Sequence, residues 1–519
     1  MTVRRILPAL ALLLMAAVAP AEEDASAGKL YQRHCANCHG ADRLGGTGPA
    51  LLPGNLSRLK QAEAEQVIRD GREATQMPAF NEQLNQEQIK ALTDRIYRAP
   101  DEEPDWTAAD IRASQRVPHL HGTLLDEPRF DADPLNLFTV VEKGDHHVSL
   151  LDGDSLERLH RFESRYALHG GLKYTPDGRY VFLGSRDGWI TKYDLYNLEV
   201  VAEVRAGINM RNIAVSADGR YVMAANYLPH TLVLFHARNL DLMKVYPVTN
   251  EQGESSRVSA VYFAPPRGSF IAALKDLKQV WEIPAPQPRE ATVSTGHMKE
   301  PLQPRRTQGT PNFRVRRIHV PEYMDDFFFD PDYRHVIGAS RNGRNGLVVN
   351  LDSGDKVAEL PLKGMPHLGS GITWEYQDTR VVAIPHLRRA AISIIDMSDW
   401  SLLKTLETDG PGFFMRSHEN SPYAWAGVFF GPHRDRVHII DKQKLEITRT
   451  LTPEPGKTAA HVEFDRYGEK ALLSIWEDDG ALIAYDADTL EEIKRIPMRK
   501  PSGKYNVWNK TRYEEGTSH

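Results

Sequence analysis

The chain has 519 residues, of which 41% are hydrophobic, and a formal net charge of -6 at pH 7. This length exceeds that of one typical domain and is enough for a large core, so we expect more than one domain. Its 64 basic and 70 acidic residues nearly balance. The chain has no long basic run and no helix-turn-helix pattern, which argues against nucleic acid as a partner.

Residues 1–21 have the pattern of a secretory signal peptide. Two arginines precede an apolar stretch from Ile6 to Val18, and we expect cleavage between Ala21 and Glu22. A membrane anchor is the alternative, but the stretch is short for a span and contains Pro8. No other stretch is apolar enough to span a bilayer. The mature protein is expected to be exported.

The only two cysteines, Cys35 and Cys38, stand in a C-x-x-C-H motif with His39. This spacing is typical of covalent haem c, with two thioethers and one axial imidazole. Half a zinc site is an alternative, but no second C-x-x-C pair supplies the other ligands. A thioredoxin-like redox pair would need a βαβ context, which is lacking. We therefore predict one covalent haem c and a role in electron transfer.

The residues around this motif, up to residue 98, have a helical pattern. Leu30 and His34 have helical spacing before the motif. Asn85, with Gln88 three residues later, predicts a capping box at the start of a last helix, which ends before Pro100.

A helix, a C-x-x-C-H motif, a loop with Thr47-Gly48-Pro49, a Gln76-Met77-Pro78 loop and a final helix follow one another. This order resembles a class I cytochrome c domain, to which we assign residues 22–98. The resemblance makes Met77 the sixth ligand of the haem iron. The alternatives are a gap-filling core methionine at this position and His34 as the ligand.

Residues 99–130 separate this domain from the rest of the chain. They begin with a segment rich in proline and acidic residues, from Ala99 to Trp106. Such a composition is typical of a linker and not of a core element.

From residue 131 to 519 short β-rich runs recur between Asp-Gly, Asn-Gly and Pro-Asp turns. Antiparallel repeats of about 40 to 50 residues are typical of a β-propeller. We count eight units between residues 135 and 505, the fourth and fifth being irregular. The expected fold is therefore an all-α class I cytochrome c domain followed by an all-β eight-bladed propeller. An array of β-sandwiches is the alternative.

A haem c domain joined to such a propeller resembles the cytochrome cd1 nitrite reductase family over nearly the whole mature chain. The resemblance is carried by Asn136-Leu137-Phe138, Leu151-Asp152-Gly153-Asp154-Ser155, Tyr166-Ala167-Leu168-His169, Met365-Pro366-His367 and Pro501-Ser502-Gly503-Lys504-Tyr505-Asn506-Val507. In that family the propeller channel binds non-covalent haem d1, and the position matching His169 is the proximal iron ligand. Ligation needs a neutral imidazole aimed down the channel. A core histidine bonded to the backbone is the alternative.

Haem d1 carries several carboxylates, and a site for it needs fixed cations. The resemblance implies that Arg186 and Arg211 bind these carboxylates and that Tyr227 faces the ring. Arg257 and Lys275 are looser candidates, for which an exposed position on a blade loop is an equally good interpretation.

One departure from the nitrite reductases concerns the distal face of haem d1. The family places two histidines there to protonate nitrite. The second matches His367, whereas the first position falls on Asp325. An ionised carboxylate there would repel nitrite. The architecture without the paired histidines resembles the dihydro-haem d1 dehydrogenases, which complete haem d1 synthesis.

This second resemblance implies a periplasmic oxidoreductase that converts a propionate of dihydro-haem d1 into the acrylate of haem d1. Electrons would leave through haem c to a soluble periplasmic acceptor, and nitrite reductase would be a recipient of haem d1. A cytochrome cd1 nitrite reductase and a non-catalytic haem d1 carrier are the alternatives.

Removing a proton from the propionate needs a base. His367, His418 and Asp325 are the candidates, and each is otherwise a polar loop residue. The sequence does not choose between them, and it leaves open the distal ligand of the iron. It also leaves open the oligomeric state, the identity of the electron acceptor, and whether haem d1 is released or handed over.

Overall fold

The computed structural model describes residues 19–46, 48–57, 59–71, 77–120, 122–285, 314–340 and 345–512. The predicted signal peptide lies outside these residues up to residue 18, as do Thr47 and Gln76 of the two expected loops. The chain divides into two compact units, Met1–Pro104 and Asp105–His519. Among the helices of the described ranges, none has the length and hydropathy needed to cross a bilayer.

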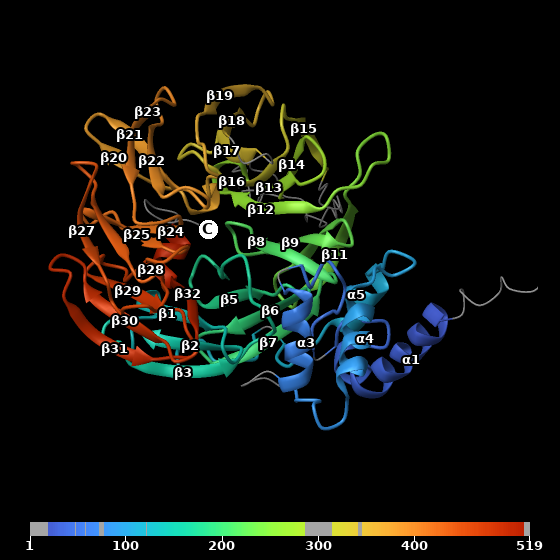
Figure 1. The fold of residues 1–519 in the computed structure, drawn as a ribbon. Helices are drawn as coiled ribbons and strands as arrows, with labels where there is room; N and C mark the ends of the chain where they lie inside the picture. Colours follow the sequence, from blue (N-terminus) through green and yellow to red (C-terminus); the bar gives the residue numbers. More distant parts are fainter. Residues whose placement is uncertain are drawn as a thin grey trace, which may run out of the picture. The chain divides into compact units, whose positions relative to one another are not determined.

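The first unit is helical, as predicted (Figure 1). It contains α1 (Ala19–His34), α2 (Ala36–His39), α3 (Gln61–Asp70) and α4 (Gln86–Tyr97). Asn85 and Gln88 form the predicted capping box at the start of α4, since each side chain accepts from the other's backbone N–H at 2.9 Å. The apolar faces of these helices meet in one core, which includes Tyr31, Phe80 and Leu92.

The second unit is a ring of eight four-stranded antiparallel sheets, which confirms the predicted propeller (Figure 1). Each blade is given from its innermost strand outwards. Blades 1 to 4 are β32 (Pro501–Asn506), β1 (Leu137–Glu142), β2 (His147–Asp152), β3 (Arg158–Glu163); β4 (Lys173–Tyr174), β5 (Tyr180–Gly184), β6 (Trp189–Asp194), β7 (Glu199–Arg205); β8 (Asn209–Val215), β9 (Tyr221–Leu228), β10 (Thr231–His236), β11 (Asp241–Pro247); and β12 (Val258–Ala264), β13 (Ser269–Leu274), β14 (Gln279–Pro284), β15 (Arg316–His319).

Blades 5 to 8 repeat the same order. They are β16 (Met324–Phe329), β17 (His335–Ser340), β18 (Gly346–Asn350), β19 (Lys356–Leu360); β20 (Ile372–Tyr376), β21 (Thr379–Pro385), β22 (Ala391–Asp396), β23 (Leu402–Glu407); β24 (Gly412–Ser417), β25 (Tyr423–Val428), β26 (Val437–Asp441), β27 (Glu446–Leu451); and β28 (Ala459–Phe464), β29 (Lys470–Ile475), β30 (Ala481–Asp486), β31 (Glu492–Pro497).

Blade 1 closes the ring because it joins both ends of the propeller sequence. Its innermost strand, β32, comes from the C-terminal part and pairs antiparallel with β1, for example Phe138 with Asn506. The short helices η1 (Pro134–Asn136) and α6 (Val507–Arg512) pack against each other beside this pairing. Two further short helices are η2 (Pro265–Arg267) and η3 (Leu368–Ser370).

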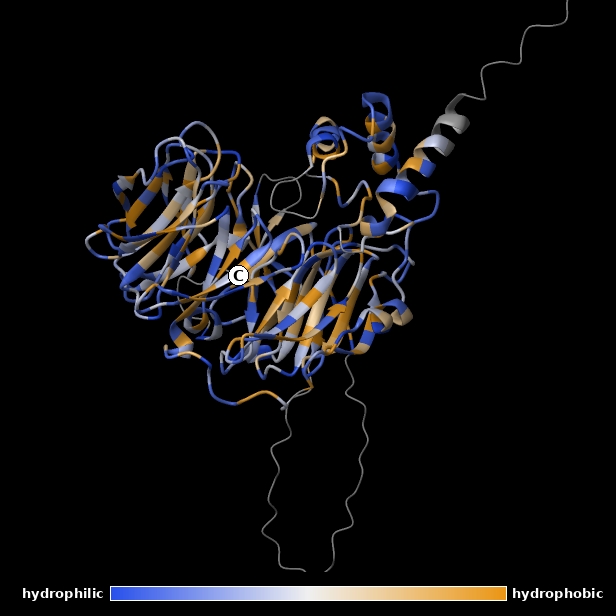
Figure 2. Ribbon diagram, turned by 90° about the horizontal axis from the view of Figure 1, so that it is seen from below, coloured by the Kyte–Doolittle hydropathy of each residue, from blue (hydrophilic) through white to orange (hydrophobic). Residues whose placement is uncertain are grey.

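The cores lie between neighbouring blades. The strands are largely hydrophobic and the loops between them are largely hydrophilic (Figure 2). One core contains Met223 of blade 3 together with Phe270 and Trp281 of blade 4, all fully buried. A blade covers both of its faces only when it stands between two others, which explains why the repeats form a ring.

The predicted linker needs correction after residue 104, because the following segment packs on the propeller. Helix α5 (Ala108–Ser114) lies against β7 and β11. Ile111 is fully buried there, and Trp106 Nε1 donates to the Arg205 carbonyl at 2.9 Å. The proline-rich composition hid this anchor because only a few apolar residues, widely spaced, make the contact.

Candidate functional site

The C-x-x-C-H motif lies in the first unit, where Cys35 caps α2 and His39 ends it. His39 Nδ1–H donates to the Pro49 carbonyl at 2.8 Å, which leaves Nε2 as the nitrogen that can bind a metal. Burial lowers the pKa of His39 and so favours the neutral form that a ligand needs. A Cβ on Gly48 would lie 2.7 Å from the imidazole, so the flat cradle beside the ring requires glycine.

The residues predicted to hold haem c fit that group. Burial raises the pKa of the Cys35 thiol to about 11, with a contribution from Cys38, so a charged thiolate is unfavourable at this site. A thioether to haem is uncharged and avoids this cost. Met77 and Cys35 pack against the same hydrophobic cluster of this unit. An apolar cluster that both Cys35 and Met77 border suits a covalently bound porphyrin.

In the propeller, His169 lies in the loop that leads into β4. Its Nδ1–H donates to the Arg211 carbonyl at 2.8 Å. Its Nε2 accepts from Arg211 Nη1 at 2.9 Å and from Arg186 Nη2 at 3.1 Å. Burial and these two guanidinium groups hold the pKa of His169 well below its usual range. The structure thus brings the predicted residues Arg186 and Arg211 to a neutral His169 imidazole, whose Nε2 lone pair accepts from both guanidinium groups here and is the one that could ligate iron in their place.

The innermost strands share an irregularity that defines the channel wall. In six of the described blades, the innermost strand carries a β-bulge near its start, and the bulged residues are Arg211, Ser259, Asp325 with Asp326, Phe413 with Phe414, His461, and Ser502 with Gly503. A bulge re-aims the side chain that it inserts. We call this set the bulge ring.

His367 precedes β20 of blade 6, opposite blade 2 in the eight-membered ring. Its Nδ1–H donates to the Phe413 carbonyl at 2.9 Å, and its ring centroid lies 4.1 Å from that of Phe413. Burial lowers the pKa of His367, although Asp326 opposes this effect, and Arg211 also acts on it. The charge of Arg211 therefore contributes to the lowered pKa of both His169 and His367.

The two adjacent aspartates of the β16 bulge have different surroundings. Asp326 accepts from Tyr262 Oη at 3.2 Å, and its charge acts on His367 and Arg211. Asp325 instead forms an ion pair with Lys275. Asp326 is therefore the aspartate whose charge acts on His367, while both aspartates act on Arg211. The role of Asp325 as a base stays a prediction, made at a bulge where an alignment by eye loses the alternation of a strand.

The looser candidates form a second group next to that ion pair. Arg257 makes a bidentate pair with Asp276 at 2.8 and 2.6 Å. Arg257 Cζ and Lys275 Nζ lie 5.6 and 5.8 Å from the ring centroid of Tyr227. The structure thus brings Tyr227, Arg257, Lys275 and Asp325 together. Both cations already have a carboxylate partner in the protein, Asp276 for Arg257 and Asp325 for Lys275.

The third predicted base, His418, lies elsewhere. It follows the far end of β24, five residues after Phe413, which corresponds to about 16 Å along a strand. It is 4% exposed, and its Nδ1 accepts from the backbone N–H of Asn420 at 3.1 Å. The structure does not bring His418 to His169 or His367.

Sequence reasoning missed His461, which lies in the bulge of β28 with a φ of 52°. Its ring centroid lies 3.7 Å from that of Phe414. Burial, with Lys504, Lys143 and His367, holds the pKa of His461 well below its usual range. A comparison of the blades' first strands position by position would have found it, since it occupies the same level as Arg211 and Asp326.

One layer further along the same strands lies a buried charged cluster. Arg416 and Glu463 form an ion pair at 2.7 Å, two residues beyond Phe414 and His461 respectively. Lys504 of β32 donates to the His461 carbonyl. Tyr505 lies beside it, and burial and Glu463 raise its pKa to about 12, so its hydroxyl stays protonated.

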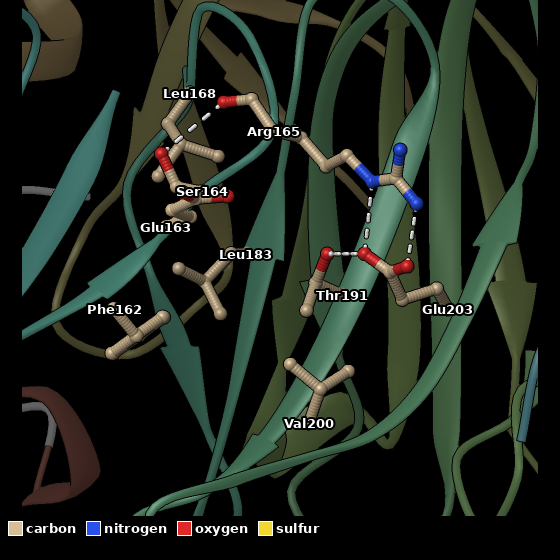
Figure 3. Close-up of a pocket in the computed structure, with 9 residues that line it drawn as sticks. All are labelled: Phe162, Glu163, Ser164, Arg165, Leu168, Leu183, Thr191, Val200 and Glu203. Carbon is tan, nitrogen blue, oxygen red and sulfur yellow. Dashed lines mark hydrogen bonds and ion pairs between the residues drawn. The ribbon is translucent and has the colours of Figure 1, made fainter. Parts of the chain in front are cut away.

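A separate cavity of about 180 Å³ lies between blades 1 and 2 (Figure 3). Arg165 crosses it and pairs with Glu203 at 2.9 and 2.5 Å, and Thr191 donates to the same carboxylate at 2.8 Å. Ligand pockets usually exceed about 300 Å³, so this cavity is too small for a tetrapyrrole.

Comparisons with known proteins agree with this geometry. The family model described as "Cytochrome D1 heme domain" matches residues 132–510, and the one described as "Cytochrome C oxidase, cbb3-type, subunit III" matches residues 22–94. The dihydro-haem d1 dehydrogenase of Pseudomonas aeruginosa is 57% identical over 507 residues, which cover 98% of each chain. Protein NirF of the same organism is 29% identical over 385 residues, which cover 71% of this chain and 90% of that protein.

Among solved structures, dihydro-haem d1 dehydrogenase NirN in complex with DHE superposes with a TM-score of 0.88 at 56% identity. The match covers 94% of this chain and 100% of that one. The predicted resemblance and the predicted class, an oxidoreductase, are confirmed. The chain belongs to the Cytochrome D1 heme domain family, here with an N-terminal cytochrome c domain that implies haem c.

Proposed function

We propose that this protein is a periplasmic dihydro-haem d1 dehydrogenase. It takes dihydro-haem d1 as substrate and oxidises one –CH2–CH2–COO⁻ side chain to –CH=CH–COO⁻. Two protons and two electrons leave in each turnover. The export signal and the covalent haem motif support a periplasmic location, and the full-length relative with 57% identity supports the substrate.

We assign different channel residues to the iron and to the carboxylates of the substrate. His169 and His367, from opposite blades, would ligate the iron through Nε2, since the Nδ1–H of each donates to a backbone carbonyl. Arg186 and Arg211 lie beside His169 Nε2 and supply fixed positive charge for carboxylates at the rim of the macrocycle. Against burial, which lowers it, the nearby carboxylates of Asp326 and Asp325 raise the pKa of Arg211 and keep that charge in place.

We assign the proton acceptors for the oxidised side chain of the substrate to blades 8 and 1. His461 presents a neutral imidazole there, and the Tyr505 hydroxyl lies one layer deeper. These groups are placed to take or relay the two protons. Haem c, when bound through Cys35, Cys38, His39 and Met77, supplies one-electron transfer to a soluble acceptor.

The position of His461 in the bulge of β28, at the level of Arg211 and next to Phe414, is the observation that carries this proposal. Burial lowers the pKa of both His367 and His461, so neither holds an imidazolium proton to donate at neutral pH, and the lone pair of His367 is available for iron while that of His461 is available for a proton. Proton abstraction needs an acceptor, whereas nitrite reduction needs two donors over the iron. The presence of His461 in addition to His367 therefore does not favour a nitrite reductase.

The test is anaerobic incubation of the protein with dihydro-haem d1 and a one-electron acceptor. We expect the extracted tetrapyrrole to lose two hydrogens by mass, while nitrite turnover stays negligible. His461→Gln and Tyr505→Phe, measured separately, should retain the absorption spectrum of the bound complex while turnover falls. Rapid nitrite reduction without loss of hydrogen would decide for the reductase, and binding without either reaction would decide for a carrier.

A further inference from the structure

Two adjacent phenylalanines, Phe413 and Phe414, occupy the bulge of β24. In a regular strand, successive side chains point to opposite faces of the sheet. Here the register of β24 against β25 shifts between Gly412 and Met415, and the two phenyl rings lie with their centroids 4.2 Å apart. The bulge therefore brings two neighbouring side chains to the same side of the strand.

Each phenyl ring lies against one of the two histidines to which the proposed function assigns the iron and the proton. The ring centroid of His367 lies 4.1 Å from that of Phe413, with 37° between the ring planes. The ring centroid of His461 lies 3.7 Å from that of Phe414, with 32° between the planes. Since the phenyl rings also contact each other, these four side chains form one continuous group of rings.

The two imidazoles differ in what else holds them. His367 Nδ1–H donates to the Phe413 carbonyl at 2.9 Å, which fixes its tautomer. Within the described ranges, neither ring nitrogen of His461 makes a hydrogen bond, and its backbone carbonyl accepts from Lys504. The torsion that turns a histidine ring about its Cβ–Cγ bond is soft. The flat contact with Phe414 is therefore the restraint that the structure supplies for the plane of His461.

The plane of each ring matters because it sets the direction of the nitrogen lone pair. A proton acceptor must lie within about 2.6 to 3.2 Å of the atom that gives up the proton. Misplacement by about 1 Å can cost about 100-fold in rate. The same direction decides how an imidazole approaches an iron ion, so both histidines need a fixed plane.

We propose that Phe413 and Phe414 are positioning residues for the reaction. Phe413 holds the plane of His367 at the iron, and Phe414 holds the plane of His461 at the side chain that is oxidised. Because the two phenyl rings touch, one bulge aligns the iron ligand with the proton acceptor. This inference rests on the proposed function and deepens it, since it names the residues that orient its two histidines.

The role of Phe413 is tested on the holoprotein loaded with ferric haem d1, the product, so that no turnover takes place. Electron paramagnetic resonance of the bound tetrapyrrole reports the orientation of the axial imidazole. Phe413→Leu should move the g-values of this signal, because the His367 ring loses its flat neighbour. Phe413→Tyr keeps the ring and should restore them. Phe414→Leu should leave them at the wild-type positions.

The role of Phe414 is tested by anaerobic hydrogen removal from dihydro-haem d1 with a one-electron acceptor. Phe414→Leu should lower kcat by about 3- to 10-fold, the effect of one aromatic pair, with KM unchanged. Phe414→Tyr should recover most of this loss. Phe429→Leu is the matched control and should leave kcat unchanged. The ring contacts of Phe429 within the described ranges are with Phe413, Phe414, Phe430 and Trp476, and not with an imidazole.

Unchanged g-values in Phe413→Leu together with an unchanged kcat in Phe414→Leu would overturn the inference. Equal effects in Phe429→Leu would also overturn it, because the rings would then act only through packing. If Phe414→Leu does not fold, Phe414→Met replaces it, since methionine keeps a similar volume without a flat face.

The proposed function can fail separately. A wild-type protein that removes no hydrogen would reject the dehydrogenase, and moved g-values in Phe413→Leu would still support the role of Phe413. Hydrogen removal by the wild type, without an effect of either ring, would reject the inference and retain the dehydrogenase.

Discussion

The surroundings of His169 fix both its tautomer and its charge. The Arg211 carbonyl takes the Nδ1 proton, and two guanidinium groups prevent protonation of Nε2. His169→Ala should therefore keep the fold and haem c while weakening binding of the d1-type tetrapyrrole and changing its absorption bands. Anaerobic titration with visible spectroscopy measures both. Bands identical to wild type would mean that His169 has a structural role only.

Met77 is the predicted sixth ligand of haem c. A thioether ligand raises the reduction potential relative to a second imidazole. Met77→His should lower the potential of haem c by a large margin, as measured by redox titration of the purified holoprotein. The hydrophobic contact that Met77 makes in the helical unit supplies the control, since Met77→Leu keeps it and removes only the sulfur ligand. If Met77→Leu leaves the ligand-field spectrum unchanged, another group ligates the iron.

Asp326 and Asp325 are a natural matched pair, since they are adjacent in one bulge but face different groups. The charge of Asp326 raises the pKa of His367 against the effect of burial. Asp326→Asn should therefore lower the pKa of His367 further, so that His367 stays neutral to a lower pH. Asp325→Asn should leave that titration unchanged, because its partner is Lys275. NMR titration of the His367 ring measures both variants in the protein without tetrapyrrole, and an equal shift in both would contradict the assignment.

At the scale of elements, strands were easier to predict than the details that build the site. Runs such as Tyr180–Gly184 and Trp189–Asp194 are rich in β-branched and aromatic residues and stand between turn signals, and the structure places β5 and β6 there. The bulges left no comparable signal. A residue inserted by a bulge cannot be told from any other strand residue in the sequence, so the sequence could not show that Asp326 and His461 lie in bulges of the innermost strands.

The capping box of α4 is an element whose contribution can be measured separately. Asn85 accepts from Gln88 N at 2.9 Å, and a capping side chain contributes about 1 kcal/mol. Asn85→Ala should lower the free energy of unfolding of the helical unit by about that amount, as followed by denaturant titration of the haem c absorption. Gln83→Ala, in the loop just before the helix, should change it little. A loss of similar size in both variants would mean that the loop and not the cap is responsible.

At the scale of the whole molecule, the repeat pattern and the C-x-x-C-H motif were sufficient to predict both units and the eight blades. His169 was predicted from the family resemblance, and its role as a ligand stays a prediction. Both patterns are local, so they can be recognised in a single sequence. Pairs of charged residues that meet only when distant segments come together cannot be recognised in this way. Asp133 and Arg466 are far apart in the chain and form an ion pair because the ring closes.

Ring closure itself is the last property that can be tested. β32 supplies the innermost strand of blade 1, and its removal would leave β1 as an unpaired edge and open the ring between blades 8 and 1. Truncation after Lys500 should therefore yield a propeller that unfolds or aggregates at a lower temperature. The haem c spectrum of the helical unit should persist, because that unit has its own core. Ile493→Pro, in the exposed outermost strand β31, disturbs an edge where proline is better tolerated and is the control. Thermal scans followed in the far ultraviolet and in the haem band separate the two units, and equal melting of the truncated and control proteins would show that β32 is not needed to hold the ring closed.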